Sequence, residues 1–243
     1  VIFGLFYYLA ALIFSFYFVP KIHKYNISSI PFFFNKRLGR NAGFVSAILM
    51  LLISSPAPYI IILCIILKHI FSIPLILSLI ISLIYSTAYI YFGGYKSIIR
   101  TDKLQFILMY LGFFLILYKI FCSSHNDILS IVNEIPAYKL KIDWYATLPW
   151  MIIALTTFID PNIIQRTYSG KDVSSVKKGF LISILFWILF DFLTISIGLI
   201  ATTSEFNLSG NGIYLQIADI VLNDNYYLKQ IFYISLLATV MSS

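Results

Sequence analysis

The chain has 243 residues and a formal net charge of +7; 60% of its residues are hydrophobic and only 11% are charged. An ordinary soluble domain carries about 25% charged residues. A water-soluble fold could not bury this much apolar surface, so the composition predicts an all-α protein that crosses a membrane several times. The apolar runs are continuous and do not alternate with polar residues, which excludes a membrane β-barrel.

The positive charge is spread over short polar stretches between the apolar runs and forms no basic face, so nucleic acid is not an expected partner. The two cysteines, Cys64 and Cys122, provide no disulfide framework. The histidines His23, His69 and His125 have no cysteine or acid at metal-ligand spacing, and the sequence shows no nucleophile–base pair or phosphate-binding loop. The sequence therefore predicts neither an enzyme nor a bound cofactor.

A helix that crosses a membrane needs about 20 apolar residues, and about seven such segments follow one another along the chain. In chain order they are Val1–Pro20, Gly43–Leu67, Ile73–Phe92, Leu104–Phe121, Tyr145–Ile164, Gly179–Thr202 and a segment that starts near Tyr227 and is cut off. Two prolines, Pro56 and Pro58, are expected to kink the second segment near its middle.

Three longer connections between these segments are expected to be polar loops. They are Lys21–Arg40, Cys122–Asp143 and Glu205–Asp224, the last with Gly210 and Gly212 as turn residues. The chain also opens and stops inside apolar runs. We therefore expect residues 1–243 to form a single transmembrane domain that is truncated at both ends.

The basic residues alternate between the two sides of the predicted membrane. Twelve lysines and arginines fall in the loops on one side and five on the other, which also holds most of the acids. The side that is richer in lysine and arginine is cytoplasmic by the positive-inside rule, so the first segment would run from the outside inward. The alternation is consistent with seven segments.

Two polar islands interrupt the apolar sequence, one from Gly93 to Gln105 and one from Asp160 to Thr167. Two acids fall within apolar segments, where a charge costs at least about 2.5–3.5 kcal/mol. Asp160 either belongs to a substrate cavity or caps a helix that Pro161 has broken. Asp191 is a candidate for intramembrane coupling, or it is protonated or hydrogen-bonded to a neighbouring helix as part of the packing.

The fifth segment has further polar features besides Asp160. Thr156 and Thr157 interrupt its apolar run, and Pro161 lacks an amide hydrogen. This pattern predicts a helix that unwinds within the membrane, although an ordinary proline kink is the alternative. Secondary transporters build substrate sites from such discontinuous helices, where a cavity satisfies the freed backbone groups. Thr156, Thr157 and Asp160 are therefore candidates for the substrate cavity.

The last residues place several neutral oxygen atoms on one helix face. Ser242 and Ser243 lie three and four positions after Thr239, so the three residues fall within about one helical turn. Neutral hydroxyl and carbonyl oxygens suit sodium, a hard cation. The alternative is that the hydroxyls bond back to carbonyls of the preceding turn.

Four motifs resemble those of the sodium:solute symporter family, in the family's order and at suitable spacing. Ile30–Gly39 resembles the family's Pro-x-Phe-x-x-x-Arg-Phe/Tyr-Gly loop, and Gly93–Gln105 resembles its Gly-Gly…Thr-Asp-x-x-Gln motif. Gln165–Gly179 resembles its Gln-Arg-x-x-x-x-Lys-Asp segment, and Leu237–Ser243 resembles the start of its Met-Ser-Ser/Thr helix. The four motifs are in register across nearly the whole chain.

The resemblance implies a helix bundle of the leucine-transporter type, built from inverted repeats. The segments would be core helices two to seven and the opening of core helix eight, without core helix one or the later helices. The fifth segment would then be core helix six, one of the two broken helices of that fold.

The resemblance also implies roles for particular residues. A sodium site would use the carbonyl and hydroxyl oxygens of Thr239, Ser242 and Ser243, together with ligands from core helix one. Asp102 matches an acid on the ion's inward exit path. Gln165 and Arg166 match a pair at the inner gate.

The implied function is sodium-coupled symport of a small polar organic solute across the bacterial cytoplasmic membrane by alternating access. Its partners would be sodium, the solute and the lipid bilayer, with no metal other than sodium. Sugar carriers place other residues at the positions of Gly4, Thr156 and Trp187, so a sugar is disfavoured, and an amino acid, a carboxylate or a vitamin-like acid stays open. The alternatives are a sensory input module of a membrane histidine kinase and a degenerate fragment without function.

Overall fold

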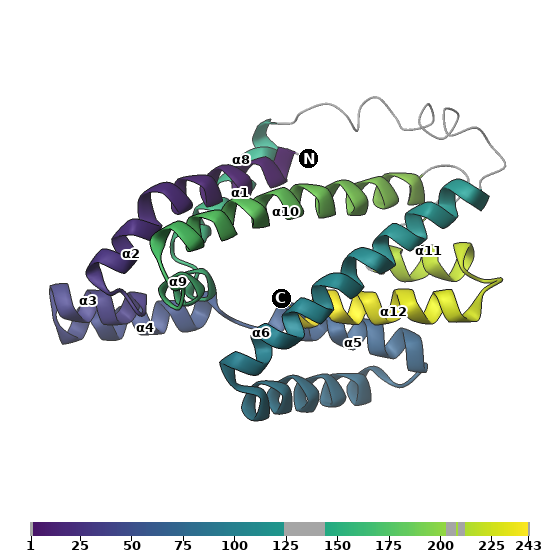
Figure 1. The fold of residues 1–243 in the computed structure, drawn as a ribbon. Helices are drawn as coiled ribbons and strands as arrows, with labels where there is room; N and C mark the ends of the chain where they lie inside the picture. The colour runs from purple at the N-terminus through teal and green to yellow at the C-terminus, as the bar shows by residue number, and fades with distance from the viewer. Residues whose placement is uncertain (1, 124–143, 203–207, 209–211, 243) are drawn as a thin grey trace. The chain divides into compact units, whose positions relative to one another are not determined.

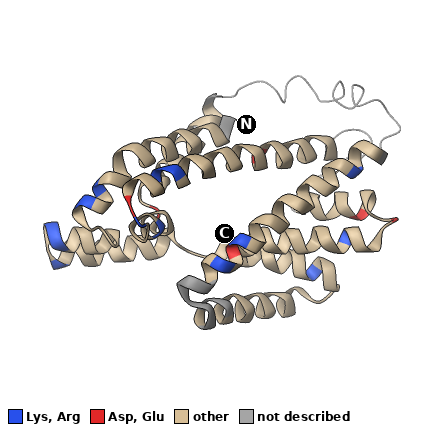
Figure 2. Ribbon diagram, in the orientation of Figure 1, with Lys and Arg blue, Asp and Glu red and all other residues tan. Residues whose placement is uncertain are grey.

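The computed structural model describes residues 2–123, 144–202, 208 and 212–242. All regular secondary structure within these residues is helical, as predicted. Most of the helical ribbon carries no charged residue (Figure 2). Five described helical stretches, some made of more than one helix and one only part of a longer helix, are long and apolar enough to cross a membrane: Gly4–Tyr25, Arg40–Phe71, Ile98–Cys122, Tyr145–Tyr168 and Val173–Ala201. The predicted third segment is represented by the shorter apolar helix Leu75–Ala88, and the seventh by a helix of 16 residues.

The helices form two compact units, each of which combines two stretches of chain (Figure 1). The first unit comprises Val1–Ser55 and Lys141–Phe192, and the second comprises Pro56–Leu140 and Leu193–Ser243. Each unit is described on its own below.

The first unit begins with an almost continuous helical segment that contains one wide turn. It consists of α1 (Ile2–Ile13), the π-helix η1 (Phe14–Phe18) and α2 (Val19–Tyr25). Pro20 explains the wide turn: proline lacks an amide hydrogen, and its ring collides with the carbonyl four residues earlier in a regular α-helix. The core of this unit is formed by the buried side chains of Phe14, Val19, Ile22 and Ile164.

The predicted loop Lys21–Arg40 is mostly helical, so the prediction of a loop there was wrong: α2 runs into it as far as Tyr25, and a helical hairpin follows. The hairpin pairs α3 (Ile30–Leu38) with α4 (Arg40–Ile53). The Ser29 hydroxyl caps α3 by accepting a hydrogen bond from the Phe32 amide at 3.3 Å. Gly39 joins the two helices with a φ of 88°, a conformation that glycine adopts without strain.

The rest of the first unit comes from the second stretch of chain. It contains α8 (Trp144–Ala154), the 3-10 helix η3 (Leu155–Phe158), α9 (Pro161–Tyr168) and most of α10 (Val173–Ala201). α1 packs against α8 and η3, and α2 packs against α9. The Asp172 carboxylate caps α10 by accepting 2.8 Å hydrogen bonds from the amide and the hydroxyl of Ser175, and these bonds lower the pKa of Asp172.

The prolines of the second predicted segment interrupt it, which corrects the predicted kink. α4 ends at Ile53, and α5 (Ala57–Phe71) begins a new helix. Pro56 stands at the N-cap of α5 and Pro58 in its first turn. A proline is tolerated in a first turn because the amide there has no partner within the helix.

α6 (Leu75–Ser123) is a single helical element of 49 residues, so the predicted loop between the third and fourth segments is helical instead. The island from Gly93 to Gln105 contains no proline to end the helix. The ribbon of α6 changes direction along its length (Figure 1). The polar residues of the island therefore lie within a helix.

The predicted loop Glu205–Asp224 also contains a helix, α11 (Ile213–Val221). Leu215, Ile217 and Ala218 are buried, so an apolar face of α11 supports it where a loop was expected. Gly212 has a φ of 104° at the start of α11, which confirms the predicted turn there. Gly210 and residues 124–143 of the predicted loop Cys122–Asp143 lie outside the described residues.

The core of the second unit is formed by three helices that pack against one another: α5, α6 and α12 (Tyr226–Met241). α6 and α12 pack closely at Gly112, where an added Cβ atom would overlap the side chain of Ser235. Small residues allow such close approach of helices in membranes.

Alanine at Gly112, which contacts Ser235, and alanine at Gly179, which lies in open space, should change the melting temperature in opposite directions. Gly112→Ala should lower the melting temperature of the purified protein, because overpacking costs about 1–3 kcal/mol. Gly179→Ala should raise it, because nothing lies within 4 Å of the added Cβ atom and alanine is favoured in a helix by about 0.5–1 kcal/mol. Differential scanning fluorimetry in detergent measures both. A Gly112→Ala protein as stable as the wild type would contradict the described packing of α6 and α12.

Candidate functional site

The fifth predicted segment is a broken helix. α8 passes into the 3-10 helix η3, the chain becomes extended at Asp160, and α9 starts at Pro161. The Thr156 hydroxyl donates a hydrogen bond to the Ile153 carbonyl at 2.6 Å, and the Ile159 amide donates to the Thr156 carbonyl at 2.9 Å. An ordinary proline kink would leave one bent helix, so the predicted interruption between Thr156 and Pro161 is confirmed.

The acid at this break is engaged in capping. One carboxylate oxygen of Asp160, Oδ1, accepts hydrogen bonds from the amides of Asn162 at 2.7 Å and Ile163 at 3.2 Å. Asp160 is therefore the N-cap of α9, as the second of the two sequence interpretations proposed. The two threonines differ in exposure: Thr157 is buried and Thr156 is exposed. Their role in a substrate cavity stays a prediction.

Asp191 of α10 is bound to a neighbouring helix. The Tyr8 hydroxyl of α1 donates a hydrogen bond to its carboxylate. Gly4 lies one turn before Tyr8, and a Cβ atom there would come within 2.5 Å of the same carboxylate oxygen. Gly4 thus allows the carboxylate of Asp191 to pack closely against α1. Gly4 and Tyr8 are four residues apart and share a helix face, which is the sequence signal that could have identified them.

The hydroxyls near the end of α12 bond back to their own helix. Thr239 donates a hydrogen bond to the Ser235 carbonyl at 2.8 Å, and Ser242 donates to the Thr239 carbonyl at 3.0 Å. Ser243 lies outside the described residues. A hydroxyl that donates its hydrogen keeps lone pairs on its oxygen, so these bonds are compatible with a cation ligand. The sodium site stays a prediction.

The three residues assigned to the inner gate and ion exit lie in separate units. Asp102 lies within α6 in the second unit and is half-buried. Gln165 and Arg166 lie on α9 in the first unit and are exposed. Their assigned roles stay predictions.

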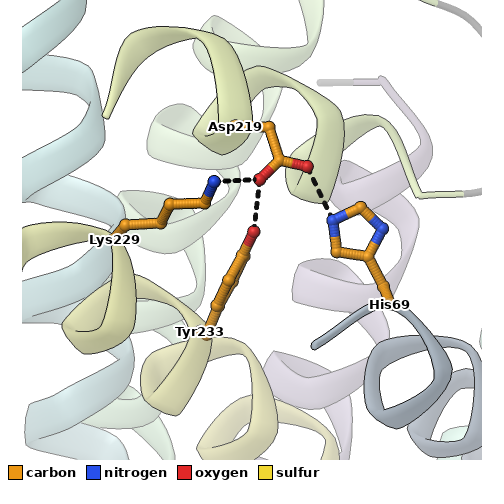
Figure 3. A network of polar contacts seen from close by, with 4 residues as sticks. All are labelled: His69, Asp219, Lys229 and Tyr233. Carbon is orange, nitrogen blue, oxygen red and sulfur yellow. Dashed lines mark hydrogen bonds and ion pairs between the residues drawn. The ribbon is translucent and has the colours of Figure 1, made fainter. Parts of the chain in front are cut away.

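A polar network in the second unit was not predicted (Figure 3). It joins His69 near the end of α5, Asp219 of α11, and Lys229 and Tyr233 of α12. The carboxylate oxygen Oδ1 of Asp219 contacts Lys229 Nζ at 2.6 Å and the Tyr233 hydroxyl at 2.5 Å. Oδ2 lies 2.7 Å from His69 Nε2. One carboxylate therefore ties α11 to the ends of two other helices.

The Asp219 carboxylate is stabilised in its charged form. Its partial burial alone would raise its pKa, but the hydrogen bonds from Lys229, Tyr233 and His69 outweigh burial and lower it. Asp219 thus remains an anion, and therefore only an acceptor of hydrogen bonds, at neutral pH.

The network borders a cavity of about 710 Å³. Its lining includes the basic residues Lys68, His69 and Lys229, the acid Asp219 and the amides Gln216 and Gln230. From the sequence, Asp219 was only one acid in an expected loop, and its partner His69 lies 150 residues away. The four-residue spacing of Lys229 and Tyr233 was the one local signal of a shared face.

The capping role of Asp160 predicts different effects for two substitutions. Asp160→Ala should destabilise the protein by about 0.5–2 kcal/mol, because the amides of α9 lose their acceptor. Asp160→Asn should keep the wild-type stability, because asparagine caps a helix about as well as aspartate. Unfolding titrations with dodecyl sulfate compare the two. If the asparagine variant were as unstable as the alanine variant, the cap would not be the role of this residue.

The comparisons with known proteins agree with the four motifs. Neither the search of curated proteins nor the search of solved structures found a match. The model of the sodium:solute symporter family matches residues 1–243. Membership of this family implies an integral membrane protein and sodium-coupled transport of a solute. Because the match extends over the whole sequence, the chain belongs to the sodium:solute symporter family.

Proposed function

We propose that the protein carries a small polar organic solute across the bacterial cytoplasmic membrane together with sodium, by alternating access. The observation that carries this proposal is the broken helix formed by α8, η3 and α9, in a chain that belongs to a symporter family. The sodium gradient and the membrane potential would drive transport, and the potential supplies about 2.3 kcal/mol per charge for each 100 mV.

The break supports transport because the hydrogen-bond pattern of a regular α-helix is interrupted there, which frees backbone polar groups. Within hydrocarbon such groups are tolerated only inside protein or beside a water-filled cavity. Thr156 and Thr157 lie in the 3-10 turn of the break, and Asp160 fixes the start of the helix that follows. This segment is therefore the proposed wall of the solute cavity.

The proposed sodium site lies at the end of α12. The Thr239 carbonyl oxygen and the Ser242 hydroxyl oxygen are 3.0 Å apart, so one ion could contact both. Both oxygens are neutral, and so is the hydroxyl of Ser243, which would be the third ligand. From the family resemblance we expect the remaining ligands to come from core helix one.

The proposed inner gate and ion exit comprise Asp102, Gln165 and Arg166, on the side that the positive-inside rule assigns to the cytoplasm. Asp191 is proposed to take part in coupling. Its carboxylate links α10 to α1 through a hydrogen bond from Tyr8, so a movement of one helix would also shift the other.

Sodium dependence tests the proposed function. The full-length protein in liposomes should accumulate at least one labelled solute, from a panel of amino acids, carboxylates and vitamin-like acids, when sodium is present outside. Replacement of external sodium by choline should reduce the initial rate of uptake to that of empty liposomes. Uptake that is equally fast in choline would contradict sodium coupling.

The assigned ligand Ser242 has a matched control. Ser242→Ala should raise the sodium concentration that gives half-maximal uptake by about tenfold, since loss of one buried polar partner is worth about 1–3 kcal/mol. Ser82→Ala removes another hydroxyl that donates to a carbonyl of its own helix, that of Ser78 at 2.8 Å, and should leave the sodium requirement unchanged. Equal sodium curves for wild type and Ser242→Ala would remove Ser242 from the site.

A further inference from the structure

The cavity of about 710 Å³ in the second unit has an excess of hydrogen-bond donors. Asp219 is the one acid among the described residues that line it, whereas the basic side chains there are Lys68, His69 and Lys229. The lining also includes the amides of Gln216 and Gln230, each of which offers both donors and an acceptor. The charged groups therefore decide what the cavity can bind.

The acceptor capacity of Asp219 is largely used within the protein. Its Oδ1 receives hydrogen bonds from Lys229 at 2.6 Å and from Tyr233 at 2.5 Å. Its Oδ2 lies 2.7 Å from Nε2 of His69, which must donate because an ionised carboxylate only accepts. A positively charged ligand would find this carboxylate already surrounded by three donors.

Two ammonium groups keep donors that the network does not use. Lys229 has three N–H groups and gives one to Asp219. Lys68 lines the cavity and makes no hydrogen bond or ion pair with any described residue. The charge of the lining is therefore positive at neutral pH, by one unit with His69 neutral and by two with His69 protonated. An anion with several acceptor oxygens complements this arrangement.

We propose that the cavity between α5, α11 and α12 binds the carboxylate group of an organic solute through Lys68 and Lys229. The proposal rests on the proposed function in one respect: it takes this solute to be the transported one. The seven-segment topology predicted from the sequence would put the ends of α5 and α12 that carry the two lysines on the outer side. The cavity would thus be an outer vestibule that gathers carboxylate-bearing solutes, because a positive cleft raises the local concentration of anions.

Three fluorinated probes of equal chain length and different charge test the proposal. They are 4,4,4-trifluorobutyrate, 4,4,4-trifluorobutanol and 4,4,4-trifluorobutylammonium, each observed by ¹⁹F NMR with the full-length protein in nanodiscs. Only the butyrate line should broaden beyond its width with empty nanodiscs. Equal broadening by the alcohol or by the ammonium compound would overturn the assignment of a carboxylate site.

Variants locate the binding. Lys68→Gln leaves the network of Figure 3 intact, because Lys68 makes no hydrogen bond or ion pair with its members, and should weaken butyrate binding at least tenfold. Lys68→Arg should bind butyrate as the wild type does, because arginine keeps the positive charge and the hydrogen-bond donors. Lys119→Gln removes a lysine of α6 that is not among the lining residues and should change nothing. Unchanged binding in Lys68→Gln would place the anion elsewhere and overturn the proposal.

Two further measurements distinguish a carboxylate site from a site for any anion, and binding from transport. Chloride at the same concentration should not displace the butyrate; if it did, the cavity would be a site for simple anions and the proposal would be wrong. The binding is measured without a sodium gradient. If the protein binds butyrate through Lys68 but shows no sodium-dependent uptake, the carboxylate site stands and the proposed function is wrong. If it shows sodium-dependent uptake but does not bind butyrate through Lys68, the proposed function stands and the carboxylate site is wrong.

Discussion

The constraint on which the rest of this structure depends is the absence of water in the hydrocarbon of a membrane. A polar group within an apolar helix is stabilised by a partner inside the protein, because an unpaired buried group costs several kcal/mol. Asp160 takes two amides of its own chain, Asp191 takes the hydroxyl of Tyr8, and the hydroxyl of Ser242 takes a carbonyl of α12. These hydrogen bonds also hold the helices in place: the first caps α9, the second joins α10 to α1, and the third ties the end of α12 to its preceding turn.

The same constraint distinguishes the irregular places in the helices from one another. Pro20 widens one helical turn, and Pro56 and Pro58 start a new helix. The break before Pro161 differs from both, because it combines a 3-10 turn, a buried threonine and a capping carboxylate. Polar groups gathered at a helix break are what a transporter needs beside a solute, which is why this segment carries the proposed function.

The sequence alone predicted the features that depend on local chemistry. The apolar segments, the break before Pro161 and the turn at Gly212 follow from hydrophobicity, a missing amide and backbone freedom. α3, α11 and the helical island in α6 were missed because polar residues were taken as a sign of loops, whereas packing and the lack of a proline decide their structure. The network of His69 and Asp219 could not be predicted, since its members meet only after folding. The direct contacts of Asp191 and Tyr8 depend on folding in the same way.

Direct measurement of sodium movement tests the central claim, that solute and ion cross together. Liposomes that contain the full-length protein are placed in ²²Na⁺, and the solute identified by uptake is then added outside. The account predicts that the solute accelerates ²²Na⁺ entry, and that the two fluxes keep a constant ratio over a range of solute concentrations. Solute that enters while ²²Na⁺ entry stays at its basal rate would contradict it.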